Sequence, residues 1–179
     1  STFTNSVIIF EPAILNCNAQ QDQPVSIFGK SDGLATVTPD GGNGGYTYYW
    51  DDGETTATAS ALSAGPHSVT VTDSKGCDTS CDVTITEPGA LYCNTELISD
   101  VICFGEANGA AKVIPSEGVA PYTYAWDNGE TTQTANAISA GSHSVTVTDA
   151  NGATSSCNVS IPEPDALSAS AIQDSPVVC

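Results

Sequence analysis

The 179-residue chain carries 21 acidic residues against three lysines and no arginine, which gives a formal net charge of −18. Three cations cannot form a basic patch, so this composition excludes nucleic-acid binding through phosphate neutralisation. The sequence contains no apolar run of about 18 residues, so no membrane span is expected in this segment.

The chain is organised by a fixed period, seen most clearly in Trp50 and Trp126, where 126 − 50 = 76. The dipeptide Glu-Pro begins at positions 11, 87 and 163, and residues 11–86 align with 87–162 without a gap at about half identity. A period of this kind indicates a tandem array, whose fold has to be predicted for one repeat at a time. A repeat of this length can fold as a small independent domain.

We therefore expect four segments in chain order. Residues 1–10 align with 77–86 and are predicted to be the last strand of a preceding repeat. Residues 11–86 and 87–162 are two complete repeats, and residues 163–179 are predicted to be the opening strands of a third. Two interpretations stay open: the chain is an excerpt from a longer array, or its terminal strand complements a neighbouring chain.

Each complete repeat is predicted to contain seven extended stretches. Apolar residues alternate with Ser, Thr and Asp along them, and glycines mark the turns between them, which is typical of an antiparallel sandwich. No stretch has the apolar spacing of an amphipathic helix. The predicted strands of the first repeat are 13–19, 25–28, 34–39, 46–50, 55–62, 66–73 and 78–86.

The fourth stretch of each repeat carries Tyr, Tyr and Trp at alternate positions, followed by a glycine turn. This spacing predicts a strand with one buried face, and a buried Trp at the centre of a small all-β module is typical of immunoglobulin-like domains. We predict tandem all-β, immunoglobulin-like antiparallel β-sandwich modules arranged head to tail. The expected core anchors are Tyr46, Tyr48, Trp50, Tyr122, Tyr124 and Trp126.

Four of the seven cysteines form two pairs of equal spacing. Cys17 and Cys81 are 81 − 17 = 64 residues apart, and Cys93 and Cys157 stand at the same positions of the second repeat. Each lies on the apolar face of a first or last strand, which predicts one disulfide within each repeat. Disulfides indicate an oxidising, extracellular setting, and the alternative is a set of buried free thiols. Zinc binding is disfavoured because no Cys-x-x-Cys motif occurs.

Several motifs of each repeat together resemble the SprB repeat of very large surface adhesins from gliding Bacteroidetes. They are Gly-x-Ala-x-Val, the Tyr-Thr-Tyr-x-Trp strand, the run ending in Val-Thr-Val-Thr-Asp, and the closing Glu-Pro. The resemblance covers two full repeats and two fragments. It implies an extracellular, cell-surface module, exported by the type IX system and involved in cell adhesion and gliding motility. His67 and His143 depart from the family, which usually has an aromatic residue there.

The same resemblance implies a further cysteine pair, of which each repeat retains one half. In the first repeat, Ile27 occupies the position where the partner cysteine of Cys77 would stand. In the second repeat, Ala153 occupies the position where the partner cysteine of Cys103 would stand. Cys77 is at the start of a predicted last strand of about nine residues, so it lies about 30 Å from the end at which the chain leaves its module. A disulfide needs two Cα atoms within about 7 Å of each other. We therefore expect Cys77 and Cys103 not to pair with each other, and the partner of Cys179 stays open.

Carboxylates cluster in the glycine turn after each Trp strand and near the linkers. Paired carboxylates hydrolyse glycosides in some enzymes, but a narrow sandwich offers little room for a concave site, so the chain is predicted not to be an enzyme. Calcium at the junctions between repeats is the one cofactor to consider, and the alternative is that the carboxylates are simply solvated. The candidate calcium ligands are Asp51, Asp52, Glu54, Glu87, Asp127, Glu130, Asp149 and Glu163.

Two non-enzymatic functions remain after these exclusions. The repeats act as a spacer or stalk in a large adhesin, with neighbouring repeats as their partners, or they bind surface polysaccharides or abiotic surfaces by polyvalency. Tyr49 would offer a stacking surface for a sugar, but the second repeat has Ala125 at that position, and this inequality favours the spacer. A filament joined by strand exchange is a third hypothesis.

Overall fold

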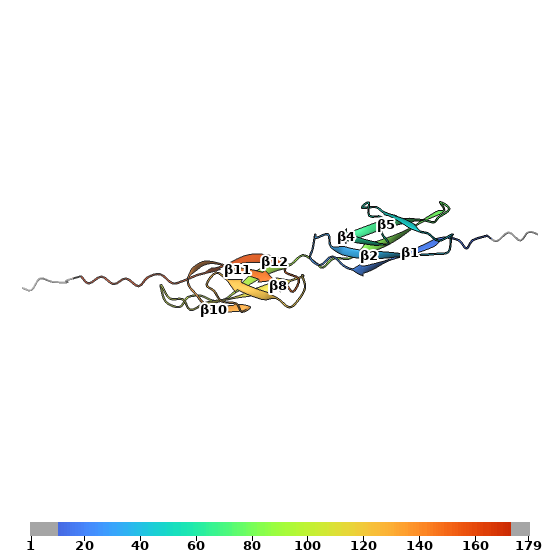
Figure 1. The fold of residues 1–179 in the computed structure, drawn as a ribbon. Coiled ribbons are helices and arrows are strands. Elements are labelled where there is room, and N and C mark those ends of the chain that lie inside the picture. Colours follow the sequence, from blue (N-terminus) through green and yellow to red (C-terminus); the bar gives the residue numbers. More distant parts are fainter. Residues whose placement is uncertain (1–10, 173–179) are drawn as a thin grey trace, which may run out of the picture. The chain divides into compact units, whose positions relative to one another are not determined.

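The computed structural model describes residues 11–172, which contain β-strands and no helix (Figure 1). The chain divides into two compact units, Ser1–Gly89 and Ala90–Cys179, called unit 1 and unit 2 below. The predicted strands within residues 1–10 and 173–179 lie outside the described residues. Residues 163–172 form no strand.

Each unit contains six strands at matching positions. The strands of unit 1 are β1 (Asn16–Gln23), β2 (Gly33–Asp40), β3 (Thr47–Trp50), β4 (Thr58–Leu62), β5 (Gly65–Thr72) and β6 (Asp78–Ile85). The strands of unit 2 are β7 (Tyr92–Ser99), β8 (Gly109–Ser116), β9 (Thr123–Trp126), β10 (Thr134–Ile138), β11 (Gly141–Thr148) and β12 (Thr154–Ile161). All pairings between them are antiparallel.

The strand order identifies the fold. In unit 1 the two sheets have the orders β1-β2-β4 and β3-β5-β6, and unit 2 repeats them as β7-β8-β10 and β9-β11-β12. These orders match the A-B-E and C-F-G sheets of an immunoglobulin domain that lacks strand D. The prediction of an all-β, immunoglobulin-like antiparallel sandwich is confirmed.

The prediction of a strand at residues 25–28 is wrong, and so is the count of seven. Val25 is buried, but it fills the core from a loop, and its amide donates to the carbonyl of Thr86. The Asp32 side chain accepts hydrogen bonds from the amide and hydroxyl of Ser26, so the two ends of this loop are joined to each other. An apolar residue held in a loop has the same local pattern as a short strand, which explains the error.

Both tryptophans lie at the centre of their cores, as predicted. Trp50 is fully buried and Trp126 is 4% exposed, and each indole N–H donates to a backbone carbonyl at 2.9 Å, that of Thr56 or Thr132. The indole therefore buries its apolar body without leaving its single polar atom unpaired. The other predicted anchors pack against the same cores and are half-buried: Tyr46, Tyr48, Tyr122 and Tyr124.

The first and last strands of each unit run in the same direction. In unit 1, Cys17 of β1 lies beside Cys81 of β6, and Val25, after β1, lies beside Thr86, after β6. The chain therefore enters each unit at one end and leaves it at the opposite end. We call these the entry end and the exit end.

Candidate functional site

A disulfide joins the first strand to the last strand in each unit. Cys17 is bonded to Cys81 and Cys93 to Cys157, with Cα–Cα distances of 6.0 and 5.9 Å. These are the two pairings that the spacing predicted. Because Cys17 is the second residue of β1, the disulfide closes a loop that contains nearly the whole unit.

Cys77 and Cys103 are free and exposed, so they do not pair with each other. Cys77 precedes β6 at the entry end of unit 1, whereas Cys103 follows β7 at the exit end of unit 2. Cys179 lies outside the described residues.

The linker glutamates belong to the unit that precedes them. Glu87 Oε2 accepts a hydrogen bond of 2.7 Å from the amide of Gly29, and Glu163 Oε2 accepts one of 2.9 Å from Gly105. Each bond ties the linker to the loop between the first two strands of its unit. Both glutamates were predicted as calcium ligands, and each has one carboxylate oxygen committed to a backbone amide.

A buried aspartate organises the turn before the last strand of each unit. Asp73 accepts hydrogen bonds from the amides of Asn43, Lys75 and Cys77 and from the side chain of Asn43, at 2.7–3.0 Å. The side-chain amide of Asn43 is the main reason that the pKa of Asp73 is lowered to about 2, and the backbone amides add to this effect. The carboxylate is therefore a structural part of the entry end.

Asp149 occupies the same position in unit 2, and it was a predicted calcium ligand. Its two oxygens accept the amides of Val119, Asn151 and Ala153 at 2.8–2.9 Å. Burial alone would raise its pKa, but these amides outweigh burial and lower it. Asp149 is 7% exposed, and its oxygens face the amides of its own turn and of Val119.

A histidine and an aspartate connect two turns on the flank of each unit. In unit 1, His67 Nδ1 lies 3.1 Å from Asp51 Oδ1, and His67 Nε2 lies 3.0 Å from the carbonyl oxygen of Ser63. Asp51 follows β3, while Ser63 lies between β4 and β5. The imidazole therefore bridges the turn after the Trp strand and the turn before its own strand.

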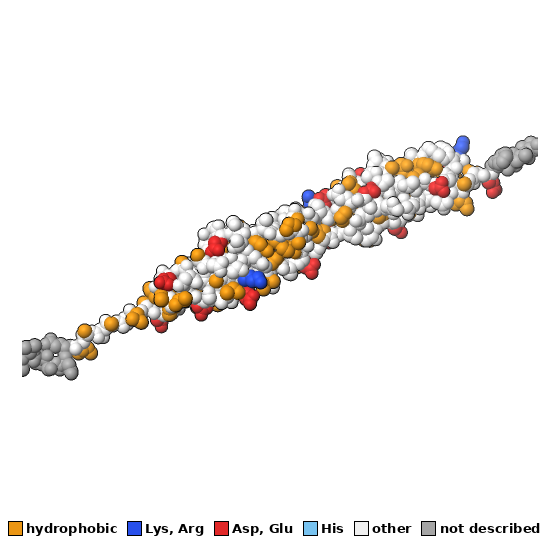
Figure 2. All heavy atoms as spheres, turned by 90° about the horizontal axis from the view of Figure 1, so that it is seen from below, with side chains coloured by type: hydrophobic (Ala, Val, Ile, Leu, Met, Phe, Trp, Pro, Cys, Tyr) orange, Lys and Arg blue, Asp and Glu red, His pale blue; other side chains and the backbone are white. Residues whose placement is uncertain are grey.

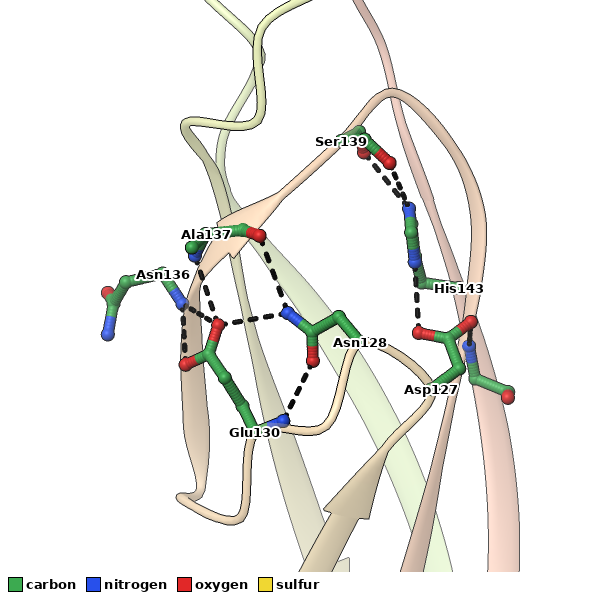
Figure 3. A network of polar contacts seen from close by, with 8 residues as sticks. Asp127, Asn128, Glu130, Asn136, Ala137, Ser139 and His143 are labelled. Carbon is green, nitrogen blue, oxygen red and sulfur yellow. Dashed lines mark hydrogen bonds and ion pairs between the residues drawn. The ribbon is translucent and has the colours of Figure 1, made fainter.

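Unit 2 contains the same arrangement, shown in Figure 3. His143 Nδ1 lies 3.0 Å from Asp127 Oδ1, and Nε2 lies 3.0 Å from the carbonyl oxygen of Ser139. Asp127 Oδ2 also accepts the amide of Ser144 at 3.0 Å. Burial would raise the pKa of Asp127, but His143 and the Ser144 amide outweigh it and hold that pKa below its usual range.

The glutamate of the same turn binds backbone amides of the next strand. Glu130 accepts the amides of Asn136 and Ala137 at 3.1 Å and the side chain of Asn128 at 3.0 Å (Figure 3). Burial would raise the pKa of Glu130, but these donors lower it. In unit 1, Glu54 accepts the amide of Ser60 at 2.8 Å in the same way.

The predicted calcium ligands are thus distributed among turns, each with partners in its own unit. Asp52, the last of them, accepts the amide of Glu54 at 2.9 Å. Among residues 11–172 no group of three or more acidic, histidine or cysteine side chains is placed to hold a metal ion. The calcium site at the junctions stays a prediction. Sequence reasoning missed the pairing of Asp51 with His67, although the same 16-residue spacing recurs in Asp127 and His143.

The outer faces of the sheets are mainly polar in unit 1, whereas the β7-β8-β10 face of unit 2 exposes Tyr92 and Ile114. Tyr49 is 64% exposed on the β3-β5-β6 face, among Ser and Thr side chains. On the face of the molecule in Figure 2, acidic side chains (red) are scattered and hydrophobic side chains (orange) form patches. Within residues 11–172 the structure contains no helix that could span a bilayer.

Comparison with known proteins finds two segments of the chain, residues 23–55 and 95–131, that match the family model of the SprB repeat. The resemblance predicted from the motifs is confirmed at these segments. Each match includes the Trp strand and the turn after it. No curated protein sequence matches the chain.

Among solved structures, the chain is similar to the three N-terminal domains of the Hoc outer capsid protein of bacteriophage RB49. That similarity has a TM-score of 0.51 at 19% identity and covers 83% of this chain and 58% of that chain. A C-terminal fragment of intimin, in complex with a Tir domain, matches at 12% identity and a TM-score of 0.39, over 86% of this chain and 64% of that chain. The titin I-band fragment I67–I69 matches at 13% identity and a TM-score of 0.38, over 86% and 66%. The chain thus spans less than two thirds of each.

Proposed function

Because the chain carries two segments that match the SprB repeat, we propose that it is a spacer in a secreted cell-surface adhesin. In this proposal it is an extended rod that sets distance and transmits tension, while ligand binding lies elsewhere in the protein. The observation that carries the proposal is the disulfide between the first and last strands of each unit.

The position of the disulfide determines how a unit responds to a pull on its ends. Tension that enters at Asn16 reaches Cys17 after one residue and crosses the disulfide to Cys81. The residues between the two cysteines then carry no tension, so the two sheets need not resist it. A unit of this kind keeps its length under load, which suits a stalk.

The chemistry of the chain supports an extracellular location. Disulfides persist in oxidising environments, and removing one from a small secreted domain typically costs about 2–5 kcal/mol. The net charge of −18 favours solubility and discourages edge-to-edge association of the short, exposed strands. Export by the type IX system and a part in gliding motility follow from the resemblance alone and belong to this proposal.

The absence of catalysis is also part of the proposal. The carboxylates of the turn after the Trp strand are bonded to His67, Ser60 and backbone amides, so they organise the turn. A site for hydrolysis would need two carboxylates facing a substrate. The role of these groups in turn structure is sufficient to explain their positions.

A second candidate function is weak, polyvalent binding to polysaccharides. The observation that favours it is Tyr49, an exposed ring on a hydroxyl-lined sheet face. Unit 2 has Ala125 at the same place. A filament joined by strand exchange would depend on the chain termini, which lie outside the described residues.

A binding assay separates the spacer from the adhesive repeat. The two-unit chain, coupled at high density to beads, is presented to immobilised neutral and acidic polysaccharides and to glass. The spacer predicts no saturable retention and no effect of Tyr49→Ala. Saturable retention that is lost in Tyr49→Ala would instead support the adhesive function and overturn the spacer.

A further inference from the structure

The imidazole of His67 lies between two hydrogen-bond acceptors. Its Nδ1 faces the Asp51 carboxylate at 3.1 Å, and its Nε2 faces the Ser63 carbonyl at 3.0 Å. A neutral imidazole has one N–H donor and one lone pair, so it can satisfy only one of these acceptors. The imidazolium ion has two donors and satisfies both, which makes it the form that fits this site.

The groups around His67 favour the same form. Its side chain is only 11% exposed, and burial alone would lower its pKa. The Ser63 carbonyl and the charges of Asp51 and Asp52 outweigh burial and raise the pKa above 6.5. On the neighbouring strand β6 the residue paired with His67 is Val83, which does not titrate.

The residue facing Nε2 is a serine in both units, Ser63 and Ser139, and in unit 2 its hydroxyl also lies near the ring. His143 Nε2 lies 3.3 Å from Ser139 Oγ as well as 3.0 Å from the Ser139 carbonyl oxygen. The hydroxyl can donate to Nε2 when the ring is neutral, while Nδ1–H donates to Asp127. Both units therefore present the same kinds of groups to the histidine ring, an aspartate at Nδ1 and a serine carbonyl at Nε2.

We propose that His67 is a pH-sensitive clamp that fastens the turn after β3 to the turn between β4 and β5 when its ring is protonated. This regulatory device goes beyond the proposed spacer function, since it concerns the contact between two turns within one unit and not the role of the unit as a spacer. Loss of the proton leaves Nε2 as a lone pair against the Ser63 carbonyl, and that contact opens. The Asp51 turn then keeps its contact with Nδ1–H, the bond between Glu54 and the Ser60 amide and backbone bonds such as the one to Ser68, and it loses the link through the ring to Ser63.

The sign of the pH dependence follows from the direction of the pKa shift. A group whose pKa is raised in the folded state stabilises the fold fully below its unfolded pKa, here 6.5. That stabilisation is lost as the pH rises through the folded pKa. The clamp is therefore closed below pH 6.5 and opens as the pH rises through the folded pKa of His67.

The test uses the whole two-unit chain, in which His67 and His143 are the only histidines. Proton NMR of the two rings gives their pKa values, and amide hydrogen exchange gives the protection of the Asp51 amide. We expect the pKa of His67 to lie above 6.5. The protection factor of the Asp51 amide should fall as the His67 ring loses its proton.

Two variants complete the test. His67→Phe fills the same space without a titrating group, and it should make the protection factor of the Asp51 amide independent of pH. Asp51→Asn removes the charge and should lower the pKa of His67. The proposal is overturned if His67 titrates at or below 6.5, or if the pH dependence of the Asp51 amide is the same in His67→Phe.

Discussion

Unit 1 and unit 2 share the indole bond and the His–Asp contact beside the Trp strand, yet residues at equal positions on their outer sheet faces differ. The indole bonds are both 2.9 Å, and the His–Asp contacts are 3.1 and 3.0 Å. On the outer face of the first sheet, Asn16 and Thr38 of unit 1 correspond to Tyr92 and Ile114 of unit 2, which are 60% and 44% exposed. The fold therefore depends on the inward residues and the turn carboxylates, and the outer faces are free to vary.

The two units also solve one turn in different ways. At the position before the Asn43 turn, unit 1 has Gly41 with φ of 77°, while unit 2 has Glu117 with φ of 59°. A Cβ on Gly41 would lie 2.1 Å from the carbonyl oxygen of Ile14. The same backbone conformation thus tolerates a side chain in one unit and excludes it in the other.

The largest expected effect comes from removing a disulfide, which breaks one unit and leaves the other intact. Replacing Cys17 and Cys81 with Ser should destabilise unit 1 by about 4 kcal/mol, because the unfolded chain regains the freedom of a 64-residue loop. Calorimetry should show that the melting temperature of unit 1 falls by more than about 15 °C while that of unit 2 is unchanged.

The matched control replaces the free cysteines. Cys77→Ser and Cys103→Ser should leave both transitions within about 0.5 kcal/mol, since these side chains are exposed and unpaired with each other. If the Cys17/Cys81 variant melts like the parent chain, the disulfide does not stabilise the unit as we describe.

A smaller effect should separate the two solutions of the shared turn. Gly41→Ala should cost about 1–3 kcal/mol through overcrowding against Ile14, in addition to the strain of a positive φ. Glu117→Ala, at the same position of unit 2, should change stability by less than about 0.5 kcal/mol. Urea unfolding of the two variants measures both values, and equal costs would show that the turns are equivalent after all.

The entry-end aspartates provide a pH-dependent comparison. The pKa of Asp73 is lowered from 3.8 to about 2, so its stabilisation is complete above about pH 4 and is lost as the pH falls through 2. Asn43→Val gives unit 1 the residue that unit 2 has at Val119, and it should raise the pKa of Asp73. Carbon NMR of the carboxylate measures this pKa, and an unchanged value would mean that the Asn43 amide has no part in the shift.

The smallest effect is expected from exchanging the exposed residues of the second sheet. Tyr49→Ala and Ala125→Tyr together make each unit resemble the other at this position, and each should change stability by less than about 0.5 kcal/mol. Thermal unfolding measures the change. A loss above 1 kcal/mol would show that the outer face contributes to the fold.

The sequence was sufficient for features that repeat with a simple period. The alternating Tyr46, Tyr48 and Trp50 predicted a buried strand, and the equal 64-residue spacing predicted both disulfides. The stretch at 25–28 was wrongly predicted as a strand because Val25 is buried without belonging to a sheet. Burial and strand structure have separate causes there.

The carboxylates could not be assigned from sequence, because each has a partner that is distant along the chain. Glu87 binds the amide of Gly29, 58 residues away, and Asp73 binds Asn43, 30 residues away. A list of acidic residues in turns therefore suggested metal ligands, whereas the fold directs many of their oxygens to backbone amides. Only the three-dimensional path of the chain reveals such pairings.

Single-molecule stretching of the two-unit chain tests most directly whether each unit is a rod locked by its disulfide. Under oxidising conditions the account predicts no step that corresponds to unfolding of a whole unit. After reduction, each unit should release about 20 nm, the extended length of a chain whose two cysteines are 64 positions apart. Steps of that length in the oxidised chain would contradict the account.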